Sequence, residues 1–107
     1  MSEIQSAVGK FIWGLGCPSK YDGFRYLLEA ICIALENGGE VMCLRKSIYE
    51  VLAKKCRTDT RNIERCIRHC IGRWWAEHQC GNLFDRKPTN SEVICYMVEY
   101  MRLGIGA

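Results

Sequence analysis

The sequence predicts an all-α protein, a compact bundle of five to six helices that contains a helix-turn-helix. Apolar residues recur three and four positions apart in five stretches, which is the spacing of one buried helix face. Glycine, proline or capping residues stand between these stretches, where helices end and begin. The alternation between apolar and polar residues that is typical of a half-buried strand is present only weakly, at 40–44.

The first two helices are predicted from apolar stripes that stop at glycines. One stripe covers 4–15 and ends at Gly16, just before a Cys-Pro pair. The next stripe lies within a helix that we expect at about 22–37. Gly38 and Gly39 can adopt the left-handed conformation that ends a helix, so they are the expected stop.

The helix-turn-helix is expected at about 46–56 and 60–78. Residues 57–59 form the tight connection, and Asp59 or Thr60 is the expected N-cap because a short oxygen-bearing side chain satisfies amides left free in the first turn. The inward positions of the shorter helix are Ile48, Val51, Leu52 and Cys56, and the outward ones are Lys54 and Lys55.

A loop and a last helix complete the predicted bundle. Gly81-Asn82 interrupts the helical pattern, and Leu83-Phe84 is expected to anchor the loop that follows. Capping residues at 89–92 precede a helix expected at about 91–103. Its apolar stripe, expected in the core or against a partner helix, consists of Tyr96, Met97, Tyr100 and Met101.

Length and composition favour one soluble domain over 1–107. The chain has 107 residues, of which 49% are hydrophobic and 25% charged, which is ordinary for a globular protein. No apolar run approaches the roughly 20 residues that cross a bilayer, and the start lacks a basic segment leading into an apolar one. We therefore expect a cytoplasmic protein without membrane contact.

The eight cysteines are expected to be reduced thiols that pack in the core, because most lie inside apolar periodic runs and none forms a Cys-x-x-Cys pair. A zinc site could be drawn from Cys66, His69, Cys70, His78 and Cys80. Its spacing matches no common zinc finger, so we expect no metal and no other cofactor. A thiol or zinc sensor stays open as a third hypothesis.

No enzyme motif is present. The sequence lacks a glycine-rich phosphate loop, a metalloprotease helix and an elbow around a nucleophilic serine, so we do not expect an enzyme. The three tryptophans, which lie on or beside apolar stripes and are expected to pack in the core, are Trp13, Trp74 and Trp75.

Positive charge is concentrated in one stretch. Residues 54–73 hold seven basic and two acidic side chains, so this stretch carries +5 and the remainder of the chain −2. A basic patch confined to about a fifth of a chain indicates a polyanionic partner, although a solvated helix face is charged as well.

The helix expected at 60–78 has two distinct faces, because successive residues lie about 100° apart. One sector holds Arg61, Glu64, Arg65 and Arg68, and the opposite sector holds Ile63, Cys66, Ile67, Cys70 and Trp74. Arginine can donate two hydrogen bonds to guanine and glutamate can accept one from cytosine, so the outward face suits base recognition in the major groove. The alternative is a solvated surface helix with an ordinary Glu64–Arg68 ion pair.

Side chains that flank the turn of a helix-turn-helix commonly meet phosphates, which position the protein without reading sequence. The residues expected in this role are Lys54, Lys55, Thr58, Thr60, Arg61, Asn62 and His69.

Several segments together indicate a family. They are Ile48-Tyr49, Leu52-Ala53-Lys54-Lys55, Ile63-Glu64-Arg65, Ile67-Arg68-His69 and Lys87-Pro88-Thr89-Asn90-Ser91-Glu92, with Gly16-Cys17-Pro18 and 23–31 extending the match to about 8–103. In these segments the chain resembles the DNA-binding effector domain of the sporulation-initiation response regulators of endospore-forming bacteria. The resemblance implies a six-helix domain that binds short promoter boxes and regulates early sporulation genes.

The resemblance also implies contacts and partners. Glu64, Arg65 and Arg68 stand where the family contacts bases of double-stranded DNA. The implied protein partners are RNA polymerase or another regulator, and a second copy of the chain in a homodimer on tandem sites.

The sequence departs from the family in three ways. The family's phosphorylatable receiver domain has no counterpart in this sequence, and the cysteine content exceeds what is usual in the family. The cysteines at 66 and 70 stand where alanine is usual, which supports their packing role. The stretch between Trp75 and Lys87 is short, so the family's fifth helix is expected to be lost or reduced to a turn around Leu83-Phe84. The missing receiver and the short connection motivate a rival hypothesis, a receiver-less interaction module or antagonist that retains the fold without tight DNA binding.

Overall fold

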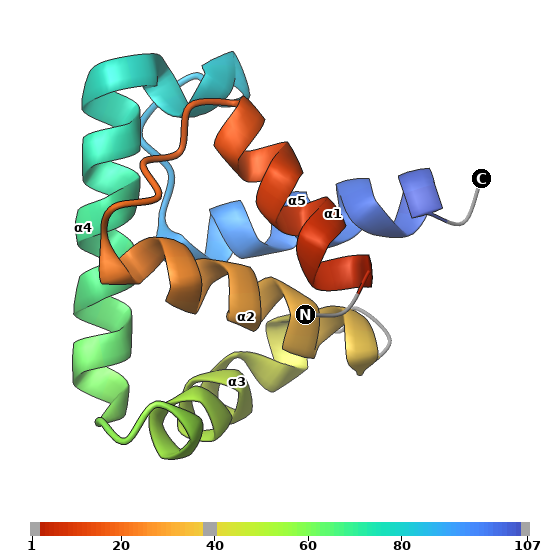
Figure 1. The fold of residues 1–107 in the computed structure, drawn as a ribbon, viewed down its shortest axis with the longest axis vertical. Helices are drawn as coiled ribbons and strands as arrows, with labels where there is room; N and C mark the ends of the chain where they lie inside the picture. Colours follow the sequence, from red (N-terminus) through yellow and green to blue (C-terminus); the bar gives the residue numbers. More distant parts are fainter. Residues whose placement is uncertain (1–2, 38–40, 106–107) are drawn as a thin grey trace.

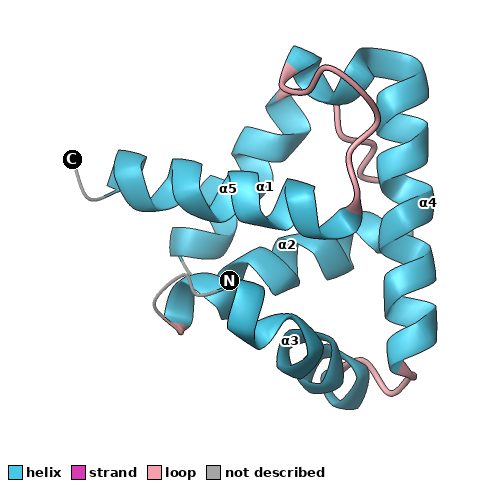
Figure 2. Cartoon of the chain, turned by 180° about the vertical axis from the view of Figure 1, so that it is seen from behind, coloured by secondary structure: helices cyan, strands magenta, loops and turns pink. Residues whose placement is uncertain are grey.

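Five α-helices and one short 3-10 helix make up the part of the chain that the computed structural model describes, residues 3–37 and 41–105 (Figure 1). In chain order they are α1 Glu3–Gly14, α2 Asp22–Glu36, α3 Val41–Lys55, α4 Thr60–His78, η1 Gln79–Asn82 and α5 Asn90–Ile105. Side chains are described for 3–37 and 47–104. These described residues contain no strand, which confirms the all-α prediction (Figure 2). None of their helices is long and apolar enough to span a lipid bilayer.

Helix α4 forms one edge of the molecule, and the other helices meet it from one side (Figures 1 and 2). The beginnings of α2 and α5 both reach the middle of α4, and the turn after α3 leads into its N-terminal end (Figure 1). The largest fully buried side chains of the core that these helices enclose are Trp74, Ile12, Leu27, Ile31, Ile48, Leu52, Ile63, Ile67, Ile71, Ile94 and Met97.

The ends of α4 follow from local chemistry. Asp59 has extended backbone angles, and its carboxylate accepts a 2.7 Å hydrogen bond from the amide of Asn62. Of the two N-caps that the sequence allows, Asp59 and Thr60, the structure therefore has Asp59. The helix ends where Gln79 takes a left-handed conformation, with a φ of 49°. Both predicted boundaries, 60 and 78, are therefore confirmed.

Helix α2 crosses α4 at Gly23 with almost no space between the two backbones. A Cβ placed on Gly23 would lie 2.1 Å from the carbonyl oxygen of Cys66 and 2.6 Å from the Cβ of Cys70. Real Cβ atoms do not approach backbone so closely, so only glycine permits this crossing.

The connection between α1 and α2 is also held against α4. The indole nitrogen of Trp74 donates a 2.9 Å hydrogen bond to the carbonyl oxygen of Leu15. Gly16 has a φ of +93°, and a Cβ there would lie 2.7 Å from the ring of His78. The connection between α1 and α2 is thus packed against the C-terminal part of α4.

The structure corrects the predicted start of α3. The helix begins at Val41 instead of about 46. Four consecutive apolar residues occupy 41–44, a run in which the three-to-four spacing of a helix cannot be recognised. The predicted stop of α2 at Gly38 and Gly39 lies outside the described residues.

Two predicted core residues prove to be exposed. Val51 is 49% exposed and Trp13 64% exposed. Each belongs to an apolar stripe, but no neighbouring helix covers the edge of the stripe on which it lies. Tyr100, also about half exposed, stacks on Phe11 with ring centroids 4.3 Å apart.

The region after α4 forms a turn and not a further α-helix, as expected. The turn is η1 at 79–82, immediately before Leu83-Phe84 and not around them. Cys80, Gly81 and Asn82 have φ values between 50° and 67°, which is why the helical pattern breaks there. Leu83 and Phe84 are half-buried against the core and anchor the loop.

All seven cysteines with described side chains are free thiols. The four that are buried are Cys17, Cys32, Cys70 and Cys80, which confirms the packing role for these. Cys66, expected to face inward, is only half-buried, at the edge of the α4 stripe.

We predict that Gly23→Ala lowers the free energy of unfolding by about 3 kcal/mol, because the new methyl group forces two backbones apart. Gly14→Ala is the matched control. No atom lies within 4 Å of a Cβ at Gly14, so this change is expected to stabilise the helix slightly, by at most about 1 kcal/mol. Urea denaturation followed by circular dichroism measures both, and equal stabilities would contradict the close crossing.

Candidate nucleic-acid interface

The outer face of α4 carries a stripe of exposed arginines. Arg61, Arg65 and Arg68 are spaced four and three residues apart, so they lie on one side of the helix, and all three are exposed. On the opposite side, Ile63 and Ile67 have no exposed surface. The two-faced helix that the sequence predicts is therefore present.

A short chain of hydrogen bonds holds Arg65. Its guanidinium donates to the side-chain oxygen of Asn62 at 2.7 Å, and the Asn62 amide group donates to the Thr58 hydroxyl at 3.0 Å. Asn62 and Thr58 are half-buried, and Asp59 caps the helix beside them. The turn between α3 and α4 thus supports the arginine through its own polar residues.

Arg68 has a looser arrangement. Its guanidinium lies 3.4 Å from the carboxylate of Glu64, one helical turn away, and both side chains are more than half exposed. Exposed pairs of this type contribute only about 0.3–0.5 kcal/mol. Both groups can therefore exchange this partner for a ligand at little cost.

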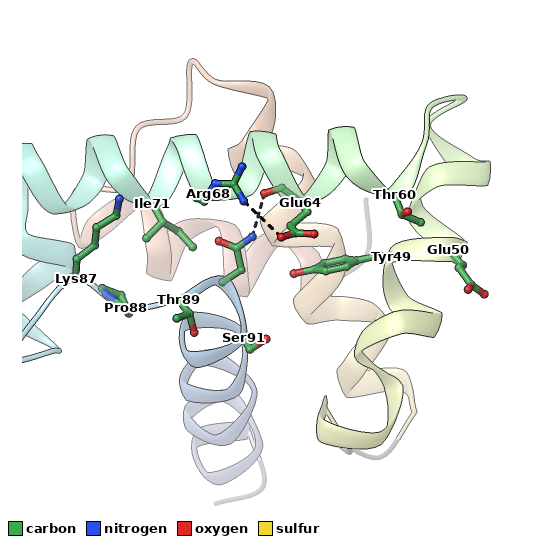
Figure 3. Close-up of a pocket in the computed structure, with 11 residues that line it drawn as sticks. Tyr49, Glu50, Thr60, Glu64, Arg68, Ile71, Lys87, Pro88, Thr89 and Ser91 are labelled. Carbon is green, nitrogen blue, oxygen red and sulfur yellow. Dashed lines mark hydrogen bonds and ion pairs between the residues drawn. The ribbon is translucent and has the colours of Figure 1, made fainter.

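Glu64 and Arg68 also line a groove of about 860 Å³ between α3, α4 and the start of α5 (Figure 3). Tyr49 and Glu50 stand on its α3 side, and residues 87–91 on its α5 side. The side-chain amide of Asn90, at the start of α5, donates a 3.0 Å hydrogen bond to the backbone carbonyl of Glu64. This bond ties the start of α5 to α4 next to the exposed arginines.

Lys87 continues the line of positive charge along α4. A Cβ placed on Gly72, one turn beyond Arg68, would lie 3.4 Å from the ammonium nitrogen of Lys87. The lysine thus occupies the space that the glycine leaves on the same stripe as Arg61, Arg65 and Arg68. We call these four residues, Arg61, Arg65, Arg68 and Lys87, the cation row.

A shallow depression beside the cation row is also basic. Its lining consists of Arg65, Arg68, His69, Gly72, Arg73 and Lys87. The sequence prediction did not include Lys87 and Arg73 among the residues of this surface. Gly72 was the available signal, because a glycine on an otherwise basic helical stripe leaves room for a cation from another segment.

The residues expected to contact phosphates differ in their exposure and in their interactions with other side chains. Lys54 and Thr60 are exposed, whereas the ammonium group of Lys55 lies 3.0 Å from the carboxylate of Glu29 on α2. His69 is exposed and contacts the ring of Tyr21 edge-on, with centroids 5.1 Å apart.

Among the described residues, no group of three or more His, Cys, Asp and Glu side chains is placed to hold a metal ion. The charged groups exposed on α4 are guanidinium and carboxylate groups, and Lys87 adds an ammonium group beside them. Such a surface suits a polyanion with hydrogen-bonding groups at its edges.

A capping box fixes the start of α5 beside this surface. The Thr89 hydroxyl accepts from the amide of Glu92 at 3.2 Å, and the Glu92 carboxylate accepts from the amide of Thr89 at 2.9 Å. Arg86 donates to both oxygens of the same carboxylate, at 3.0 and 2.7 Å. The guanidinium of Arg86 and the Thr89 amide lower the pKa of Glu92 to about 2.

The fold and this surface define a class of protein. An exposed basic helix preceded by a short turn and another helix is the arrangement of a helix-turn-helix DNA-binding domain. The family described as Sporulation initiation factor Spo0A C terminal matches residues 8–101. The chain belongs to this family, whose members are DNA-binding effector domains of sporulation regulators and not known as enzymes. This match confirms the resemblance found in the sequence.

We predict that Glu92→Gln flattens the acid dependence of stability. Because the pKa of Glu92 is lower in the folded protein, its contribution is present above the ordinary value of 4.5 and is lost as the pH falls from 4.5 towards 2. Thermal unfolding between pH 5 and 2 measures the slope. Glu99→Gln, which removes another exposed α5 carboxylate outside the cap, serves as the charge control. A Glu92→Gln protein that loses stability in parallel with the wild type would contradict the assignment.

Proposed function

We propose that this chain binds double-stranded DNA sequence-specifically, with α4 in the major groove, and thereby regulates transcription at the initiation of sporulation. The observation that carries the proposal is the exposed stripe of arginines on a helix whose other face is buried. Glu64, Arg65 and Arg68 would contact base edges, and the whole of 1–107 would act as one DNA-binding domain.

The dimensions of the stripe suit this role. The seven steps from one residue to the next between Arg61 and Arg68 rise by about 10 Å, which corresponds to roughly three base pairs of B-DNA. Arg65 and Arg68 can each donate two hydrogen bonds to a guanine, and the Glu64 carboxylate can accept from a cytosine amino group. The local bond from Arg65 to Asn62 orients the guanidinium before DNA arrives.

Phosphate contacts would come from both sides of the stripe. Lys54, Thr60, Arg61 and His69 are exposed around α4, and we add Lys87 because its ammonium group extends the cation row. Thr58 and Asn62 would act mainly by holding Arg65, since their side chains bond to each other. Lys55 would contribute less, because Glu29 already pairs with its charge.

The proposal also covers the binding partners of the chain and the cellular compartment in which it acts. Family membership supports DNA as the partner, and RNA polymerase or another regulator would be the protein that receives the signal at a promoter. Two copies could bind tandem sites as a homodimer. We expect the protein to act in the cytoplasm.

The rival function, an interaction module or antagonist, has one structural observation in its favour. Large apolar side chains of α1 and of the end of α5 are exposed, namely Trp13, Tyr100 and Leu103. Gel shifts with sporulation-type promoter boxes, run beside sizing of the free protein, distinguish the two. Tight association with another protein and no retention of DNA would favour the rival.

We predict that Arg65→Ala and Arg68→Ala each weaken binding to the preferred site by about 1–3 kcal/mol and relax the preference at one base pair. Selection from a random DNA pool identifies the site, and fluorescence anisotropy measures the affinities. Arg102→Ala, an exposed arginine near the end of α5, is the matched control and should bind as the wild type does. If both α4 variants keep the wild-type base preference, α4 does not read the bases.

We predict that Lys87→Ala reduces the slope of log affinity against log salt by about one counterion, without changing the preferred sequence, because it removes one phosphate contact. Lys10→Ala, an exposed lysine on α1, controls for the loss of charge. An unchanged slope for Lys87→Ala would remove this residue from the interface.

A further inference from the structure

Two thiols that are 53 residues apart in the chain meet in the core. The sulfur atoms of Cys17 and Cys70 lie 3.8 Å apart, and their residues are 1% and 0% exposed. Cys17 belongs to the connection between α1 and α2, whereas Cys70 belongs to the buried face of α4. Neither takes part in the surface that is proposed to bind DNA.

Packing and hydrogen bonding hold the backbone segments that carry Cys17 and Cys70. The Trp74 indole is hydrogen-bonded to the carbonyl of Leu15, two residues before Cys17. Gly23 packs directly on the backbone of Cys66 and on the Cβ of Cys70. The contact between the sulfur atoms is therefore a property of the packed core and not of a loose segment.

We propose that Cys17 and Cys70 form a disulfide when the protein meets hydrogen peroxide, and that this bond fastens α4 to the connection between α1 and α2. The disulfide itself does not depend on the proposed DNA-binding function.

The geometry requires only a small movement. A disulfide bond is about 2.05 Å long, so the sulfur atoms must approach by roughly 1.8 Å, which rotation of the two side chains can supply. The helices need not move, and the cation row on the far side of α4 stays as it is. Hydrogen peroxide is the appropriate oxidant because it is little larger than water and both sulfur atoms are buried.

The chemistry has two steps. A hydrogen bond from Cys17 lowers the pKa of Cys70, while the same hydrogen bond and burial raise the pKa of Cys17, so Cys70 is the thiol that ionises first. The Cys70 thiolate attacks one peroxide oxygen, the O–O bond breaks, and a sulfenic acid and water result after proton transfer. The Cys17 sulfur then attacks the sulfenic sulfur and releases a second water. Two thiols and one peroxide thus give one disulfide and two waters.

A third buried thiol is the natural competitor. Cys80 has no exposed surface. It lies near enough to raise the pKa of Cys17, and burial together with the nearby Cys70 raises the pKa of Cys80 itself to about 11. Its own thiol faces the backbone carbonyl of Ile71 at 3.9 Å. The 3.8 Å contact between the sulfur atoms of Cys17 and Cys70 favours that pair, and peptide mapping separates the two possibilities.

The test treats the full wild-type chain with hydrogen peroxide, blocks the remaining thiols, and maps the peptides without reduction by mass spectrometry. A peptide that links Cys17 to Cys70 and has lost two hydrogens is expected. The cross-link should raise the thermal midpoint by roughly 10 °C or more, since it closes a loop of 53 residues, and a thiol reductant should reverse the rise. Sulfinic or sulfonic acids without a cross-link, a link through Cys80 or Cys66, or an unchanged midpoint would overturn the proposal.

Two variants provide the controls. Cys17→Ala should lose both the cross-link and the thermal shift, whereas Cys95→Ala, a half-buried thiol on α5, should keep both. If circular dichroism shows that Cys17→Ala does not fold, the mapping of the wild-type protein decides the question alone.

DNA affinity, measured before and after oxidation at a temperature where both forms are folded, should change less than twofold. Loss of DNA binding by the cross-linked form would contradict the claim that α4 keeps its position.

Discussion

The close crossing of α2 over α4 at Gly23 is the constraint on which the rest of the structure depends. The absence of a side chain lets the start of α2 lie on the backbone of α4 at Cys66. The inner face of α4 is thereby held against the core, in which Ile63, Ile67 and Trp74 have no exposed surface. A helix held this firmly from one side can leave its other side bare, which is the requirement for a helix that enters a groove of DNA.

The bare side of α4 is organised by segments distant in sequence. The turn before the helix holds Arg65 through Asn62, and the start of α5 is tied to Glu64 through Asn90. Lys87 lies over Gly72 and lengthens the row of charges that begins at Arg61. The capping box at Thr89 and Glu92 matters to this surface because it fixes the segment that carries the lysine.

The covered side has a chemistry of its own. Cysteine is a small apolar residue when buried, and Cys17, Cys70 and Cys80 fill the space where the first connection packs on α4. Packing alone accounts for their burial, but it also places two sulfur atoms in contact. The exposed face of α4 therefore carries the charges proposed to bind DNA, and its buried face carries one of the two thiols proposed to form a disulfide.

Local signals in the sequence were sufficient to determine α4, because the Asp59 cap and the three-to-four spacing act within one or two turns of the chain. They were not sufficient for the start of α3 at Val41, where four apolar residues in succession hide the period. Periodicity also shows which residues share a face but not how far a neighbour covers it, so Trp13 and Val51 proved exposed. Only the tertiary structure decided the positions of Lys87 beside Gly72 and of Cys17 beside Cys70, because these contacts join segments that nothing in the local chain relates.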